Sequence, residues 1–219
     1  GVEVTWAMAE MNTATWATPA SATPPQRRPR PNRRFPPEVL TDAEVAALMA
    51  ACGEDGPTSA RNRALIAILY RAGLRISEAL ALYPKDIDLE AGSIRVLHGK
   101  GDRHRLCGVD PGVSAFVRFW HAYRRFWPVT DCQPLFCTRG GKALSSGYVR
   151  RLLPALARLA NIHKRVHAHG LRHTHAAQLR EEGLDVGIIS KQLGHRSILT
   201  TIRYLDHVAP VAVVQAVRQ

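Results

Sequence analysis

One short stretch of this chain alternates apolar and polar side chains, and it lies among segments of helical periodicity. Residues 92–109, GSIRVLHGKGDRHRLCGV, alternate on both sides of a Gly-Lys-Gly-Asp turn, which is the pattern of a β-hairpin. A weaker candidate strand is PLFCT, residues 134–138. The other regular segments repeat apolar residues at helical spacing, and they are residues 41–52, 59–73, 76–82, 112–126, 145–160, 170–182, 185–193 and 197–205. We therefore predict an α+β fold that is mainly α, a helical bundle with a small antiparallel β-sheet.

The first two predicted helices have clear boundary residues. Thr41 and Glu44 form a capping box, in which both side chains satisfy backbone N–H groups at the helix start. Gly73 follows the second helix, and glycine favours helix C-termini because left-handed backbone angles cost it little. Regular structure is therefore expected to begin close to residue 41.

The first 35 residues differ in composition from the rest. They are rich in Ala, Thr and Pro, and they lead into PPQRRPRPNRRFPP, where five arginines alternate with prolines. Proline removes backbone donors and favours an extended chain, so we expect residues 1–35 to be a poorly ordered basic linker or arm. Such an arm either lies along a DNA backbone or stays solvated. Residues 36–207 form the main predicted domain, and residues 208–219 form a C-terminal tail.

The charge of the chain favours a polyanionic partner. Lys and Arg together number 30 against 18 Asp and Glu, which gives a formal net charge of +12. Basic side chains near phosphates release condensed counterions on binding, so we expect nucleic acid as the partner. The alternative is a basic surface with no such partner.

Cysteine usage and hydropathy predict a cytoplasmic location without membrane contact. The four cysteines, Cys52, Cys107, Cys132 and Cys137, include no C-x-x-C pair, so we expect reduced thiols rather than disulfides or a zinc site. No apolar run reaches the length of a membrane helix. The N-terminus lacks the basic-then-apolar order of a signal peptide, and it begins with Gly1 rather than Met, as a fragment or a processed product would.

Two segments before the middle of the chain carry residues suited to phosphate chemistry. In YRAGLRISEAL, residues 70–80, Arg75 follows a glycine turn and Glu78 lies one helical turn later. Glu78 either orients the guanidinium or forms a structural salt bridge with it. In HGKGDRHR, residues 98–105, Lys100 lies between two glycines at the hairpin tip. Such a lysine is either solvated or in contact with a phosphate or a leaving group.

Two later segments add histidines, an arginine and a tyrosine. In HGLRHTHA, residues 169–176, His169 and Arg172 lie near a helix N-terminus, whose dipole favours an anion. In LGHRSILTTIRYLDH, residues 193–207, His195 precedes Ser197, a plausible N-cap, and Tyr204 lies two turns into the helix that follows. A tyrosine in such a place is, taken alone, more often a core or surface residue than a nucleophile.

Together the four segments resemble the tyrosine recombinase (phage integrase) family. The family pattern is Arg…Lys…His-x-x-Arg…His…Tyr. Here it becomes, in order, Arg75, Lys100, His169, Arg172, His195 and Tyr204. The local contexts GLRISEAL, GKG and LGH match as well, and the resemblance covers about residues 36–207. It implies the catalytic fold of the tyrosine recombinases.

The resemblance implies an enzyme that cleaves and rejoins DNA strands without metal, ATP or another cofactor. Arg75 and Arg172 would clamp the nonbridging phosphate oxygens. Tyr204 would attack the phosphorus and remain joined to the 3′ phosphate, so that the bond energy is kept for rejoining.

The remaining roles also come from the resemblance. Lys100 would give a proton to the leaving 5′ oxygen, and His169 would assist proton transfer at Tyr204. His195 would hydrogen-bond the phosphate, and Glu78 would support Arg75.

The partners implied are double-stranded DNA and further copies of the chain. The resemblance implies a homo-tetramer on DNA during synapsis, in DNA integration or recombination on phage, plasmid, transposon or chromosomal DNA. The apolar segment VAVVQAV after Pro210 would dock on a neighbouring protomer or pack on its own. Family members usually carry a helical DNA-clamping domain ahead of the catalytic domain. This chain has no room for it, so we expect either a truncated sequence or a minimal recombinase.

Three other interpretations stay open from the sequence. The first is a relaxing enzyme of the type IB topoisomerase class, and the second is a DNA-binding module without activity. The third concerns HKRVHAHGLRHTHA, residues 163–176, whose five histidines offer a metal site as an alternative. Because no H-E-x-x-H pattern is present and the cysteines lie elsewhere, we predict no metal site. Four of these histidines are instead expected to contact the DNA backbone or pack structurally, and they are His163, His167, His173 and His175.

Overall fold

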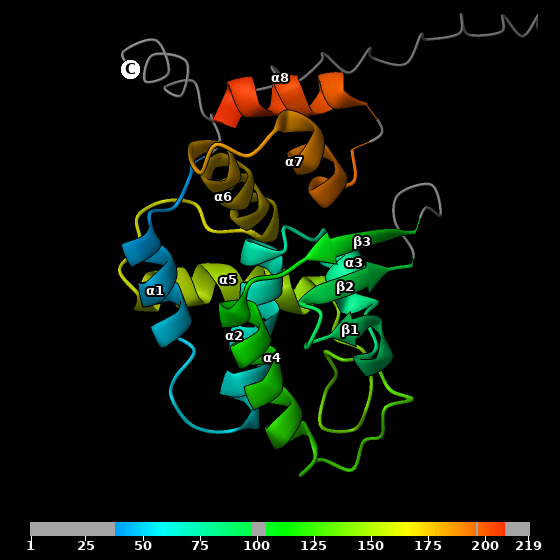
Figure 1. The fold of residues 1–219 in the computed structure, drawn as a ribbon. Coiled ribbons are helices and arrows are strands. Elements are labelled where there is room, and N and C mark those ends of the chain that lie inside the picture. Colours follow the sequence, from blue (N-terminus) through cyan, green and yellow to red (C-terminus); the bar gives the residue numbers. More distant parts are fainter. Residues whose placement is uncertain (1–37, 98–103, 196, 209–219) are drawn as a thin grey trace, which may run out of the picture. The chain divides into compact units, whose positions relative to one another are not determined.

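A computed structural model describes residues 38–97, 104–195 and 197–208 of the chain (Figure 1). Helices dominate these residues, as the sequence predicts. The helices are α1 (Asp42–Ala50), α2 (Pro57–Arg71), α3 (Ile76–Leu80), the 3-10 turn η1 (Pro84–Asp86), α4 (Pro111–Arg124), α5 (Ser146–Leu159), α6 (Ala168–Glu181), α7 (Val186–Leu193) and α8 (Ile198–Val208). The strands are β1 (Ile87–Asp88), β2 (Ser93–Val96) and β3 (Arg105–Gly108). The predicted arm and most of the tail, together with Lys100, lie outside the described residues.

The predicted hairpin forms, and one short strand extends it. β2 and β3 pair antiparallel with Ile94 opposite Cys107, and β1 pairs on the other side of β2. Ile94, Val96 and Cys107 are buried, whereas Leu106 between them is 63% exposed. One face of the sheet is therefore packed on the core and the other meets solvent, as the alternating pattern requires.

The prediction of a strand at PLFCT, residues 134–138, is wrong. Among these residues only Cys137 takes part in a β-bridge, an isolated one with Ala143. The backbone of Leu135 donates instead to Leu82 O at 2.7 Å, and Phe136 O accepts from Leu144 at 3.0 Å. These apolar side chains are fully buried, so the segment fills the core as an irregular turn. The periodicity of a short apolar run cannot distinguish a buried strand from such a turn.

Helix α2 is the centre of the main core. It packs on α4 and α6, and it buries almost every side chain between Ala60 and Tyr70. One of these is Arg61, whose guanidinium is satisfied by Cys137 O at 3.0 Å and by the Tyr148 hydroxyl at 2.7 Å. A buried charge with all-round hydrogen bonding fixes how α2 meets α5 and the turn at Cys137.

A second, smaller core holds the last three helices together. Ala176 of α6, Ile189 and Leu193 of α7, and Leu205 of α8 form this cluster, with Tyr204 packed against it. α7 ends at Gly194, whose φ of +63° is the left-handed conformation of a helix C-terminus. The chain can therefore change direction after α7, and α8 lies across α6 and α7 (Figure 1).

Two further sequence predictions concern membranes and cysteines. In the part of the chain that the structure describes, no helix is long and apolar enough to cross a membrane. All four cysteines lie in this part, and none forms a disulfide.

Candidate active site

The fold brings together six of the seven site residues predicted from the sequence. Arg75 and Glu78 lie at the start of α3, and His169 and Arg172 lie on the first turns of α6. His195 precedes α8, and Tyr204 lies on that helix. The seventh, Lys100, is outside the described residues. Segments far apart in sequence therefore meet between α3, α6 and α8; Arg75, for example, donates to Gly194 O, 119 positions later.

Arg172 is anchored from behind by backbone carbonyls. The side chain is only 2% exposed, and its guanidinium donates to Gly73 O and to Leu193 O. Its Nη2 atom lies 3.4 Å from His195 Nε2. Burial and then the nearby Arg75 charge lower the pKa of Arg172 to about 10, so it still carries a positive charge at neutral pH.

Glu78 holds Arg75 in place. Its carboxylate accepts from the Arg75 backbone at 2.9 Å and from Arg75 Nη1 at 2.7 Å. Burial works to raise the pKa of Glu78, but hydrogen bonds from Arg105 and Arg75 outweigh it and bring the pKa to about 2. The Arg75 side chain is 30% exposed, against 1% for Glu78, so the guanidinium is open to solvent while its support is not.

His195 is held by a buried hydroxyl. Its Nδ1 atom lies 2.8 Å from Thr201 Oγ1 on α8, and Thr201 is fully buried. Burial and the charge of Arg172 lower the pKa of His195 to about 4. The imidazole is therefore neutral at pH 7 and is fixed by Thr201 on the side away from Arg172.

Tyr204 is enclosed by three imidazole rings. Its ring stacks on His173 at 4.7 Å between centroids, with an interplanar angle of 16°, and meets His195 edge-on at 5.3 Å. The His169 centroid lies 6.4 Å away. Burial raises the pKa of the Tyr204 phenol, and the charges of Arg172 and Arg75 lower it in part. The phenol is thus protonated at neutral pH and needs a base before it can act as a nucleophile.

The other histidines of the segment differ in their surroundings. His167 caps α6, because its Nδ1 atom accepts from the Gly170 backbone at 2.7 Å. His173 and His175 are buried, and His163 is exposed. In residues 38–97, 104–195 and 197–208 no three His, Cys, Asp or Glu side chains could hold a metal ion.

Three further residues contact this site and were not predicted from the sequence: His173, Thr201 and Arg105. His173 follows Arg172 directly, yet only the crossing of α8 over α6 reveals its contact with Tyr204. Thr201 shares a helix turn with Tyr204, which was a usable indication. Arg105 reaches Glu78 from β3, and nothing local in the sequence indicates that contact.

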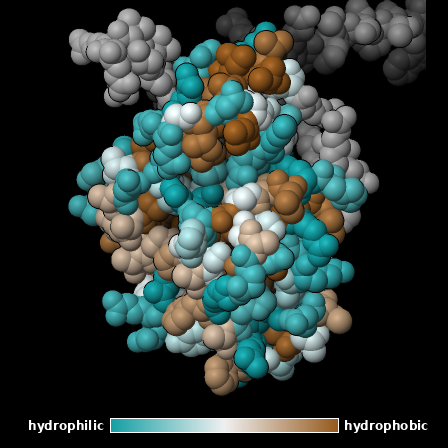
Figure 2. Space-filling model, in the orientation of Figure 1, coloured by the Kyte–Doolittle hydropathy of each residue, from teal (hydrophilic) through white to brown (hydrophobic). Residues whose placement is uncertain are grey.

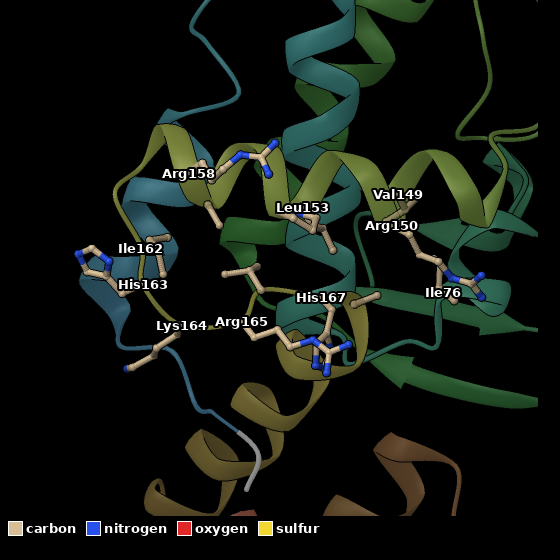
Figure 3. Close-up of a pocket in the computed structure, with 14 residues that line it drawn as sticks. Ile76, Val149, Arg150, Leu153, Arg158, Ile162, His163, Lys164, Arg165 and His167 are labelled. Carbon is tan, nitrogen blue, oxygen red and sulfur yellow. The ribbon is translucent and has the colours of Figure 1, made fainter. Parts of the chain in front are cut away.

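A basic pocket opens beside the site, between α5 and the chain leading into α6 (Figure 3). The cavity measures about 450 Å³, and Leu153 and Ile162 are among its apolar lining residues. Among the lining residues that the structure describes, none is acidic. Its rim carries exposed basic side chains, and these are Arg150, Arg158, His163 and Arg165. The rim suits a phosphate backbone.

An apolar surface lies at the other end of the site, on α7 and α8. Figure 2 shows apolar side chains gathered over these two helices. The exposed members are Ile188, Ile198, Leu199 and Ile202. Large apolar side chains clustered on a surface favour contact with another protein segment.

Comparison with known proteins gives a consistent result. The sequence profile of the phage integrase family matches residues 38–209. The tyrosine recombinase XerC of Xanthomonas axonopodis pv. citri is 36% identical over 199 residues, which are 89% of this chain and 62% of that protein. The tyrosine recombinase XerD of Mycobacterium leprae is 37% identical over 202 residues, which are 88% of this chain and 62% of that one. The chain thus spans about three fifths of the length of these relatives.

Solved structures confirm the predicted fold class. The crystal structure of XerA recombinase matches with a TM-score of 0.73 at 28% identity, over 83% of this chain and 64% of that one. XerH recombinase, solved with its palindromic difH substrate after cleavage, matches with a TM-score of 0.68 at 29% identity, over 83% of this chain and 53% of that one.

Proposed function

Because the chain belongs to the phage integrase family of tyrosine recombinases, we propose that it is a site-specific recombinase that cleaves and rejoins DNA through a 3′-phosphotyrosyl intermediate at Tyr204. The observation that supports this most is the meeting of Arg75, Arg172, His195 and Tyr204 at one site. Two guanidiniums can offset the charge of a phosphodiester and a phenol can supply the nucleophile, without a metal ion.

The two arginines would neutralise the scissile phosphate. The nonbridging oxygens of a phosphodiester repel a nucleophile until their charge is offset, and two guanidiniums can offset it. Arg172 is held by two carbonyls and Arg75 by a carboxylate, so neither needs to reorganise when DNA arrives. Such preorganised donors stabilise the pentacoordinate transition state more than mobile ones.

Proton transfer would be shared among the remaining residues. His169 lies beside Tyr204 with part of its side chain exposed. Partial desolvation of its ring, followed by the Arg172 charge, lowers the pKa of His169. At neutral pH this imidazole is therefore free to accept the phenol proton. His195, which is neutral, would hydrogen-bond the phosphate. Protonation of the leaving 5′ oxygen is assigned to Lys100 on the family resemblance alone.

Double-stranded DNA is the proposed substrate. XerH, a relative in fold and sequence, was solved on its difH substrate, and the net charge of +12 here fits the same class of partner. The basic rim formed by Arg150, Arg158, His163 and Arg165 would contact the backbone next to the site.

We further propose that four copies assemble on paired DNA sites in the cytoplasm. The apolar surface of α7 and α8 would receive a segment of a neighbouring copy, and residues 208–219 are the candidate segment. The four unpaired thiols fit a reducing compartment.

Covalent trapping tests the proposal. The chain is incubated in EDTA with a library of nicked duplexes, in which cleavage frees a short fragment that diffuses away. We expect a protein–DNA adduct on denaturing gels, and we expect it to vanish in Tyr204→Phe. A strict need for Mg²⁺, or DNA binding with no adduct that depends on Tyr204, would contradict the proposal. Recombinant joints between two DNA sites would distinguish a recombinase from a relaxing enzyme.

A further inference from the structure

Glu78 is a buried carboxylate that two arginines share. The residue is 3% exposed. Arg105 from β3 donates two parallel hydrogen bonds to it, from Nη1 to Oε1 at 2.9 Å and from Nη2 to Oε2 at 2.8 Å. Arg75 binds the same two oxygens from α3, through its backbone N–H and its Nη1 atom. The bidentate pair with Arg105 is the stronger geometry of the two.

The two arginines differ in what they present to solvent. The side chain of Arg105 is 12% exposed and that of Arg75 is 30% exposed. Arg105 is therefore the more enclosed of the two arginines, and Arg75 is the one more open to solvent. With both arginines the cluster has one net positive charge, whereas the Arg75–Glu78 pair alone is neutral. A neutral pair attracts a phosphate far less than a cluster with a free positive charge.

Arg105 also fixes the turn that leads to His195. A β-carbon on Gly194 would come within 2.8–2.9 Å of the Nε, Cδ and Cζ atoms of Arg105, so the guanidinium packs directly on this glycine. The carbonyl of Gly194 in turn accepts from Arg75 Nη2 at 3.4 Å. The Arg105 side chain on β3 thus contacts both Glu78 of α3 and the turn after α7.

We propose that Arg105 is a positioning residue, which supplies the countercharge for Glu78 and so leaves the charge of Arg75 available to the scissile phosphate. Arg105 acts through Glu78 and Arg75 and does not touch the substrate. The inference rests on the proposed recombinase chemistry. It predicts that loss of Arg105 slows cleavage while DNA affinity is largely kept.

The test is a double-mutant cycle on the full chain. Single-turnover cleavage of a nicked duplex is measured for wild type, Arg105→Met, Glu78→Gln and the double variant, with affinity measured at the same salt concentration. We expect Arg105→Met to cleave about 10- to 100-fold more slowly, as small misplacements of reacting groups do. In the Glu78→Gln background, Arg105→Met should lower the cleavage rate by less than about threefold, because no carboxylate remains to neutralise Arg75.

Matched controls separate this role from packing or folding. Arg95→Met removes an exposed arginine from β2 of the same sheet and should leave the rate unchanged. If Arg105→Met fails to fold, Arg105→Gln replaces it, since it also removes the countercharge but keeps a polar side chain that can hydrogen-bond to Glu78. Equal losses of rate in both Glu78 backgrounds, or a wild-type rate in the folded neutral variant of Arg105, would refute the inference. Absence of any adduct from wild-type protein would instead refute the proposed function.

Discussion

His175 makes the stability of this fold depend on pH in a way that the structure quantifies. The ring is 4% exposed and packs on Gly73, and both ring nitrogens are buried without a hydrogen-bond partner among the described residues. Burial and then the charges of Arg71 and Arg172 lower the pKa of His175 to about 4, against the opposing effect of Asp110. The folded protein therefore keeps this imidazole neutral across most of the acidic range.

The sign and size of the effect follow from linkage. In the unfolded chain the pKa of a histidine is about 6.5, so the unfolded state binds the proton first as the pH falls. The contribution of the neutral His175 ring to the free energy of unfolding is then fully present above pH 6.5. It is lost as the pH falls from 6.5 to about 4. The pKa of His175 is about 2.5 lower in the folded than in the unfolded protein. This difference corresponds to a loss of free energy of unfolding on the order of 3 kcal/mol from this one side chain.

The test compares wild type with His175→Met, which fills similar space with a flexible apolar side chain. The free energy of unfolding is measured by urea denaturation from pH 7 to pH 4 at constant ionic strength. We expect the wild-type curve to fall by about 3 kcal/mol more than the variant curve over this range. Other histidines with lowered pKa values, such as His195, are present in both proteins and cancel.

His163→Met, which replaces an exposed histidine of the same segment, is the control and should keep the wild-type profile. If the curves of wild type and His175→Met stay parallel from pH 7 to pH 4, the reasoning about the buried imidazole is wrong.

Three further outcomes are expected. Gly73→Ala should destabilise the fold by roughly 2–4 kcal/mol in denaturant unfolding, because the backbone φ is +61° and the new β-carbon would lie 2.6 Å from a buried imidazole carbon. Thr201→Val keeps the shape of a buried side chain but removes the 2.8 Å contact to His195, so single-turnover cleavage should fall by about tenfold, while exposed Thr200→Val leaves it unchanged. Trp120→Phe should cost about 2 kcal/mol of stability, because it vacates space in the core and leaves a backbone carbonyl without its 2.9 Å donor; a change below 0.5 kcal/mol would contradict this.

The sequence alone predicted the helices and the hairpin, and it supplied the candidate site residues that the fold brings together. Helix periodicity, the capping box of Thr41 and the alternation around the hairpin are local properties, since backbone hydrogen bonds in helices and tight hairpins join residues close in the chain. The order of Arg75, Arg172, His195 and Tyr204 could likewise be read along the chain. Each is a chemically distinct side chain in a recognisable local context.

Only the tertiary structure decided how these residues are held. Arg172 donates to Gly73 O, 99 positions away, and Glu78 pairs with Arg105, 27 positions away. The same limit explains the wrong strand at residues 134–138, whose apolar side chains meet the core without a partner strand. Burial sets the pKa values and fixes the guanidiniums, and it depends on which distant segments exclude water from a given atom. No local pattern contains that information, because desolvation is a property of the packed chain.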